Sequence, residues 1–326
     1  MKKELLSFII ILLATFTCYG SDISNETFEI KELNLVMVKC PAGSFMMGSP
    51  EEEKTKWFTH KDEYLHSVTI TKPFYIGKYE VTQSQYSALM ENIPQGYIEA
   101  KNFVESTFYE KLKDFCGRMN MNYLKKILIV WKNIVKKKYY SALDKKNPSR
   151  YKGTNNPVES ITYEQANDYC EKLNIKFLNI LPKGYKFALP TEAQWEYACR
   201  AGTNTALNNW KNLTSENGAC PNLDEVGWYI KNSGDKTHEV GQKKPNSWGI
   251  YDMHGNVWEW CKNWYGEYPK ESVTDPIGAI SGSYRVARGG CHGSDPYHNR
   301  SACRRNCFTN SEYCNIGFRL ALVPVD

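Results

Sequence analysis

The alternation of apolar and polar positions predicts short strands near the start of the chain. The run 35–38 alternates into the turn residues 41–43, and a second apolar run follows at 45–49. Apolar runs on either side of a turn that contains proline and glycine are typical of strands. The runs 66–70 and 74–77 have the same character. We therefore expect strand, turn and strand, followed by two further short strands.

Three later segments are expected to be helices. Thr82 is a favourable N-cap for a helix over 82–90. Apolar residues recur at helical spacing in 162–173, which predicts a second helix. Thr191 begins a third helix, because Gln194 occupies the capping-box position three residues later.

The C-terminal part of the chain has a different composition. Beyond Gly202 it is rich in Gly, Asn, Trp and Pro, and its apolar runs are short. We expect much of this part to be irregular and to be held by buried aromatic rings and side-chain hydrogen bonds. The predicted fold class is therefore α+β with much irregular structure.

The segment 91–146 interrupts this pattern with a lysine-rich stretch. Its apolar residues recur at helical spacing while most of its lysines fall elsewhere, which predicts a helical insertion that docks by an apolar stripe. A basic helix that binds a partner is the alternative. The stripe consists of Leu124, Ile127, Leu128, Trp131 and Val135.

Composition and charge exclude several classes of protein. The chain has 326 residues, of which 41% are hydrophobic and 13% aromatic, so it can bury a core and is not disordered. The net charge is +5, and much of the basic excess lies between Lys111 and Lys146, so no nucleic-acid partner is expected. No apolar run approaches the ~18 residues of a membrane-spanning helix.

Residues 1–20 have the pattern of a secretory signal peptide. Two lysines precede the apolar run 5–17, which is too short to span a bilayer. Cys18 follows directly, where a bacterial lipoprotein carries its acylated cysteine; plain cleavage near Gly20 is the alternative. We expect export to the outer surface or the periplasm, with membrane contact only through an N-terminal lipid. One acyl chain needs a second contribution for stable anchoring, and the sequence identifies none.

The eleven cysteines do not form a regular disulfide framework. Cys40, Cys170 and Cys199 lie in apolar or helical contexts, where free thiols pack well. No CxxC motif occurs, so a zinc site made of thiolates is not expected. Four more cysteines crowd into the C-terminal segment: Cys291, Cys303, Cys307 and Cys314.

A series of motifs in register resembles the formylglycine-generating enzyme (sulfatase-modifying factor) family over residues 33–323. The resemblance implies that family's C-type-lectin-like fold, with 91–146 as an insertion. The motifs are Gly43-Ser44-Phe45-Met46-Met47-Gly48, Tyr79-Glu80-Val81-Thr82, Asn156-Pro157-Val158, Leu189-Pro190-Thr191-Glu192-Ala193-Gln194-Trp195-Glu196, Gly249-Ile250-Tyr251-Asp252-Met253-His254-Gly255-Asn256-Val257-Trp258-Glu259-Trp260, Arg285-Val286-Ala287-Arg288-Gly289-Gly290 and Gly317-Phe318-Arg319-Leu320.

The resemblance implies a structural calcium site near the longest of these motifs. Asn256 and Glu259 are the metal candidates by resemblance, and Gly255-Asn256 suits a tight turn with positive φ. A carboxylate between Trp258 and Trp260 must be paired, cap backbone groups or bind a hard cation. A structural hydrogen-bond hub is the alternative to calcium.

The catalytic features of the family are not retained at the aligned positions. Its aerobic enzymes use two C-terminal cysteines that bind copper, and thiolates are the ligands that select Cu(I). The aligned residues are Asn299 and Ser301. A shifted pair of Cys303 with Cys307 or Cys291 would be required for oxidase activity, and copper is expected only in that case.

The segment 291–314 has an unusual composition. Lys, Glu, Gln, Met and Trp account for 80 of the 326 residues, yet only Glu312 occurs among these 24 positions. Codons that end in a pyrimidine cannot encode those five amino acids, so randomisation of Asn codons at their adenines would give this composition. The segment resembles the variable region of the proteins diversified by retroelements, most closely the spirochaete Treponema type.

These observations predict an exported, non-catalytic protein that binds an unknown protein or small molecule at the cell surface. The alternatives are a formylglycine-generating oxidase, which needs an accessible cysteine pair in a cleft, and a fixed non-catalytic scaffold. His292 and His298 would be metal ligands only if a nearby carboxylate pair completed the set. The expected ligand contacts are Cys291, His292, Gly293, Ser294, Asp295, Tyr297, His298, Asn299, Ser301, Cys303, Arg305, Cys307, Phe308 and Tyr313.

Overall fold

A computed structural model describes residues 26–50, 53, 62–90, 147–310 and 315–325. The predicted signal peptide with Cys18, the insertion 91–146 and Tyr313 lie outside the described residues. Within the described part, no helix is long and apolar enough to cross a membrane.

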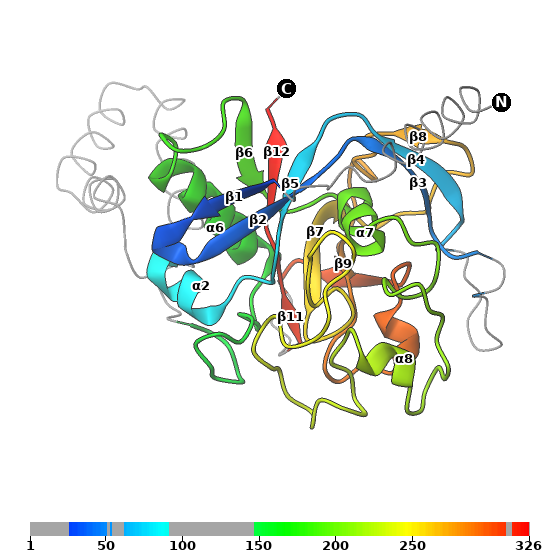
Figure 1. The fold of residues 1–326 in the computed structure, drawn as a ribbon. Coiled ribbons are helices and arrows are strands. Elements are labelled where there is room, and N and C mark those ends of the chain that lie inside the picture. The colour runs from blue at the N-terminus through cyan, green and yellow to red at the C-terminus, as the bar shows by residue number, and fades with distance from the viewer. Residues whose placement is uncertain (1–25, 51–52, 54–61, 91–146, 311–314, 326) are drawn as a thin grey trace, which may run out of the picture.

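The first sheet gathers strands from both ends of the chain. It has five strands in the order β1-β2-β5-β12-β6, and Figure 1 shows the C-terminal β12 between β5 and β6. The helices α2 (Gln83–Met90) and α6 (Tyr163–Lys176) pack beside it, and α6 contacts β6. The strands are β1 (Thr27–Ile30), β2 (Leu35–Cys40), β5 (Phe74–Gly77), β6 (Tyr185–Ala188) and β12 (Ala321–Pro324), and the 3-10 turn η1 (Lys31–Leu33) follows β1.

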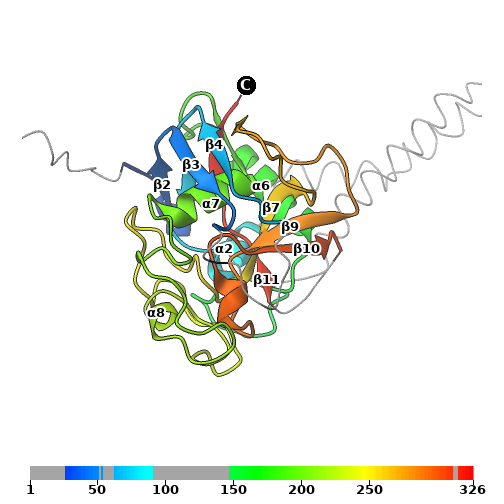
Figure 2. The same cartoon turned by 90° about the vertical axis from the view of Figure 1, so that its right-hand side faces the viewer.

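Two smaller sheets surround α7 (Glu192–Arg200), which contacts both. The four-stranded sheet has the order β10-β9-β7-β11, and the three-stranded sheet has the order β3-β4-β8. Figure 2 shows β9 and β10 side by side at one flank of the molecule. The elements are β3 (Gly43–Met47), β4 (His66–Ile70), β7 (Trp258–Trp264), β8 (Val273–Thr274), β9 (Tyr284–Arg288), β10 (Arg304–Phe308) and β11 (Ile316–Gly317), with α8 (Pro221–Asp224) and the 3-10 turn η3 (Pro296–Asn299).

The helix starts predicted from capping residues are confirmed. The hydroxyl of Thr162 accepts a hydrogen bond from the backbone N–H of Gln165, whose side chain bonds back to the Thr162 N–H. Thr191 and Gln194 form the same reciprocal pair at the start of α7. Because these bonds span only three residues, the sequence alone can specify them.

The mixed α+β class is confirmed, as is the irregular character of the chain beyond Gly202. Between α7 and β7 the structure has only the four-residue helix α8. Trp258 and Trp260 are both buried in the larger apolar core. Gly255 and Asn256 adopt φ angles of 117° and 64°, as the predicted tight turn requires.

Candidate ligand-binding surface

Two glycines connect β9 to the segment from Cys291 to Asn310. Both adopt a backbone conformation that other residues rarely adopt. Gly289 and Gly290 have φ angles of 98° and 77°. A Cβ atom on Gly290 would lie 2.2 Å from Oδ1 of Asn299. This close approach fixes where the segment turns away from the sheet.

Arg288 holds the segment 291–310 through hydrogen bonds to its backbone. Its guanidinium donates to the backbone carbonyls of Ser301 (2.7 Å) and Ala302 (2.9 Å), and it forms ion pairs with Glu192 and Glu196. All of these charged groups are buried. Because a buried charge is tolerated only when it is paired and hydrogen-bonded, the backbone of 301–302 is held in one place.

Arg300 anchors the same segment to the other side of the molecule. Its Nη1 atom lies 3.1 Å from a carboxylate oxygen of Glu63 and 3.3 Å from one of Glu53, and its Nε donates to the carbonyl of Tyr297 at 3.0 Å. The Arg300 side chain is 1% exposed. The segment is thus tied to residues more than two hundred positions earlier in the chain.

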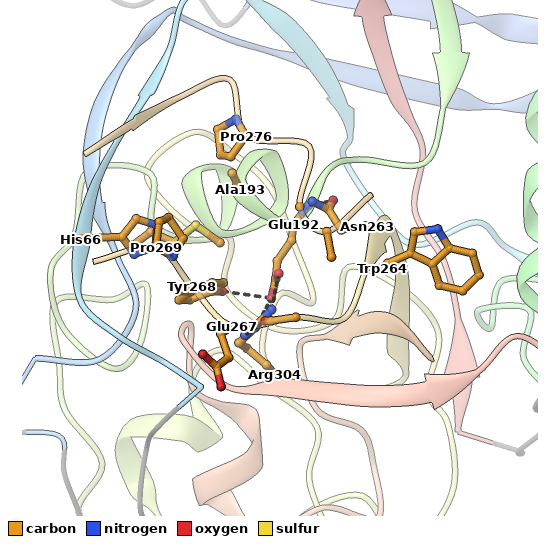
Figure 3. A pocket seen from close by; sticks show the side chains of 14 residues that line it. His66, Glu192, Ala193, Asn263, Trp264, Glu267, Tyr268, Pro269, Pro276 and Arg304 are labelled. Carbon is orange, nitrogen blue, oxygen red and sulfur yellow. Dashed lines mark hydrogen bonds and ion pairs between the residues drawn. The ribbon is translucent and has the colours of Figure 1, made fainter. Parts of the chain in front are cut away.

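Arg304 lines a cavity of about 50 Å³ between α7 and β10. Figure 3 shows Arg304 and Tyr268 both reaching Glu192, and the Arg304 nitrogens lie 2.6 and 2.9 Å from the Glu192 oxygens. Burial alone would raise the pKa of Glu192, but Arg304 and Arg288 hold it below its ordinary value. The acid in this cavity is therefore a neutralised structural partner and not a proton donor.

Asn299 and Ser301, which the family resemblance placed at the positions of the catalytic cysteines, have structural roles. Both side chains are fully buried. The Asn299 amide donates to the carbonyl of Asp295 at 2.8 Å, and the Ser301 backbone N–H and hydroxyl both donate to the carbonyl of Ala206. A substrate approaching the surface would reach neither side chain.

The thiols of the described residues do not fit a copper site. All eight cysteines in this part of the chain are free and buried. Burial raises the pKa of Cys303 to about 12 and that of Cys307 to about 11, and it also raises the pKa of Cys291. Because the thiolate is the form that ligates metal and attacks disulfides, these raised pKa values disfavour both roles at neutral pH.

Asn256 and Glu259 do not fit a calcium site. The oxygens of Glu259 accept from Nε1 of Trp195 (2.7 Å) and from Nε and Nη2 of Arg319 (2.6 Å each). The side-chain oxygen of Asn256 accepts from the backbone N–H of His238, and its amide nitrogen donates to Glu80. No group of three or more His, Cys, Asp or Glu side chains in the described residues could hold a metal ion. Glu259 is the paired carboxylate of a buried hydrogen-bond hub.

The structure divides the expected ligand contacts into buried and outward-facing sets. The prediction that each contact faces solvent left burial of any one of them open, and the side chains of the buried set do not face solvent. The buried set is Cys291, His292, Tyr297, Asn299, Ser301, Cys303 and Cys307. The set that is at least partly exposed is Gly293, Ser294, Asp295, His298, Arg305 and Phe308.

His292 is also unsuited to metal binding at the surface. It is 3% exposed, its Nδ1 lies 3.8 Å from a carboxylate oxygen of Asp235, and its ring packs edge-on against Tyr151. His298 is partly exposed, and burial lowers its pKa, so it is neutral at physiological pH.

We call the outward-facing set, together with the exposed Asn306, the displayed surface. It consists of the loop that leads into η3 and of β10, which is the edge strand of its sheet. Phe308 is 52% exposed, and its ring centroid lies 4.5 Å from that of Tyr284. Sequence reasoning missed Asn306, because its exposure depends on its place on the edge strand β10.

Comparison with known proteins places this geometry in a family. Residues 25–323 match the sulfatase-modifying factor enzyme 1-like domain. The formylglycine-generating enzyme of Mus musculus is 29% identical over 87% of this chain and 74% of its own length. The chaperone protein LppX of Paenibacillus barcinonensis is 31% identical over 71% of this chain and 74% of its own length. Among solved structures, Treponema denticola variable protein 1 superposes with a TM-score of 0.65 and 25% identity, over 92% of this chain and 99% of that one.

Proposed function

Because the chain belongs to the sulfatase-modifying factor family, whose formylglycine-generating enzymes share its fold, we propose that it uses this scaffold without catalysis, as an exported protein that binds ligands. The binding site is the displayed surface. Its ligand is a protein or small molecule met outside the cytoplasm.

The observation that carries this proposal is the separation of anchoring side chains from displayed ones. Arg288, Arg300 and Arg304 are each neutralised by buried glutamates and hold the backbone of the segment. The ion pairs of these three arginines are made with glutamates outside the displayed surface. Substitution at the displayed positions therefore changes what the surface can bind without removing what holds the fold.

Two observations support a non-catalytic role. The aligned positions carry Asn299 and Ser301, which hold backbone groups inside the protein. The described thiols are buried, and burial raises the pKa values of Cys303 and Cys307, which disfavours their thiolate forms. A copper-dependent oxidation assay with a cysteine-containing peptide is expected to give no product; turnover that depends on Cys303 or Cys307 would overturn this part of the proposal.

The likeness to Treponema denticola variable protein 1 and the composition of 291–314 support diversification of the site by a retroelement. The locus is expected to contain a near-identical copy of the codons for 291–314 that differs only at adenines, beside a reverse transcriptase gene. If no copy exists, the protein is a fixed binder and the compositional argument fails.

A display experiment tests the site itself. One library randomises Ser294, His298, Arg305, Asn306 and Phe308, and a matched library randomises an equal number of anchoring positions. The first library is expected to remain mostly folded and to yield binders to unrelated target proteins. Equal loss of folding in both libraries, or no binders from the first, would refute the assignment.

Export and lipidation need a separate test. Metabolic labelling with a fatty acid is expected to mark the wild-type protein and not the Cys18→Ser variant, and cell fractionation is expected to find both outside the cytoplasm. Retention of the wild-type protein in the cytoplasm would contradict the proposed location.

A further inference from the structure

The end of α6 carries an exposed apolar cluster that the proposed ligand site does not use. Ile175, Leu178 and Ile180 are 67%, 68% and 52% exposed. Phe177 between them is buried, and its carbonyl accepts from the backbone N–H of Ile180 at 3.0 Å. The loop is thus held in place, with three aliphatic side chains directed outward within six residues.

Two exposed lysines follow this cluster in the chain, one just before β6 and one on β6. Lys183 and Lys186 are exposed, and neither has a carboxylate within ion-pair distance among the described residues. Lys176 is paired with Glu32 at 2.6 Å. An apolar cluster bordered by two lysines that have no carboxylate partner among the described residues is complementary to a surface with an apolar interior and negatively charged headgroups.

The chain enters the fold next to this cluster. β1 is the first described strand, and Phe28 on it packs against Phe187 of β6, with ring centroids 6.3 Å apart. The ion pair of Lys176 with Glu32 joins the end of α6 to the turn after β1. Cys18 precedes Glu26 by eight residues, which span at most about 29 Å when extended. An N-terminal lipid would therefore tether the protein near this end.

The cluster and the part of the displayed surface at η3 lie at different ends of the molecule, while β10 lies on the flank between them. Figures 1 and 2 show the α6–β6 loop at the end that also carries the C-terminus, while α8 and the orange segment that includes η3 lie at the other end. Attachment through the first end would leave the second directed away from the surface.

We propose that Ile175, Leu178 and Ile180, with Lys183 and Lys186, form a membrane-docking tip that inserts into the interface of an anionic bilayer. A single acyl chain binds a membrane too weakly for stable anchoring, and insertion of the tip supplies the additional binding free energy. This inference rests on the proposed function, because it concerns the protein after export. Vesicle binding by the purified protein, however, is independent of export, of lipidation and of the ligand site.

Vesicle flotation tests the tip with the chain from Tyr19 onward, produced without lipid. The probes are phosphatidylcholine vesicles and vesicles that contain about 30% phosphatidylglycerol, a negatively charged lipid. The wild-type chain is expected to bind the anionic vesicles. Replacing Ile175, Leu178 and Ile180 together with serine is expected to lower the partition constant at least about tenfold, because the apolar area available for insertion is lost.

Two further variants separate the apolar and charged contributions. Lys183→Gln with Lys186→Gln is expected to reduce binding to anionic vesicles about tenfold and to leave binding to neutral vesicles unchanged. Ile277→Ser with Ile280→Ser is the matched control, because these residues are 70% and 95% exposed but lie in another loop. This control is expected to bind as the wild type does.

Equal vesicle binding by the triple serine variant and the wild type would overturn the proposal. Failure of the wild-type chain to bind would also overturn it. If the triple variant then melted at a lower temperature than the wild type, the cluster would be covered by another part of this chain. Leu178→Glu serves as a second variant, and it should retain the wild-type melting temperature while losing vesicle binding.

Discussion

Asp252 offers a direct test of the electrostatics of the core. Its carboxylate is buried near Glu80, Glu259 and Arg319, and the partly buried Lys243 is a second, weaker source of positive charge. One oxygen accepts from the backbone N–H of Gly241 at 2.6 Å, and the other has no hydrogen-bond partner in the described residues. We expect Asp252→Asn to stabilise the protein at neutral pH, because asparagine keeps an acceptor and removes the surplus charge.

The sign and size of this effect follow from the pKa. Burial, reinforced by Glu259, raises the pKa of Asp252 from 3.8 to about 6. The folded state therefore holds this proton more tightly than the unfolded state, and stability falls as pH rises from about 4 to about 6. Above that range the ionised carboxylate costs up to about 3 kcal/mol. A buried amide proton without a partner would cost about 1–2 kcal/mol, so the expected net gain is about 1–2 kcal/mol.

The assay is urea unfolding followed by tryptophan fluorescence at pH 7.5 and pH 4.5. The variant is expected to be more stable than the wild type at pH 7.5 and to lose this advantage at pH 4.5, where the folded wild type is already protonated. Glu192→Gln is the control of opposite sign, since it removes the carboxylate partner that Arg304 has among the described residues and one of the two that pair with Arg288. If Asp252→Asn were equally destabilising at both pH values, the carboxylate would be ionised and needed, and the reasoning would be wrong.

Three further predictions concern the segment that carries the displayed surface, and each is measured by urea unfolding. Arg300→Met is expected to cost about 3–5 kcal/mol, because it leaves buried carboxylates unpaired. Gly290→Ala is expected to cost well over the ~1–2 kcal/mol of a positive φ alone, whereas Gly184→Ala, at a φ of 78° with nothing within 4 Å, costs only that amount; equal costs would contradict the close approach at Gly290. Phe308→Ala is expected to change stability by less than about 1 kcal/mol, and a larger loss would show that this residue belongs to the core.

Local signals in the sequence were sufficient for the regular elements. The capping pairs at Thr162 and Thr191 act over three residues, and the alternation in 35–38 and 66–70 is read directly from neighbouring positions. Strand β10 was not predicted, because its Arg-Arg-Asn-Cys-Phe sequence has no clear alternation. Its pairing with β9 holds it in the sheet instead.

Local sequence signals were not sufficient to predict the candidate site. Composition singled out 291–314 as unusual, but it could not separate Cys303, which is buried, from the exposed Phe308. The partners that decide this are distant in sequence, as Arg300 and Glu63 illustrate. The same holds for Glu259, for which the sequence left calcium and a hydrogen-bond hub open until Arg319 was seen to occupy both of its oxygens.

The sequence by itself thus determined the α+β class, the helix starts and the family to which the chain belongs. Caps, periodicity and motifs depend on residues that are close together in the sequence. Only the tertiary structure decided which side chains of the C-terminal segment face outward and which carboxylates are neutralised. Burial and ion pairing depend on groups that are distant in sequence and are brought together by the fold, as Arg288 and Glu192 are. The energies of such pairs depend on their surroundings and cannot be read from either residue alone.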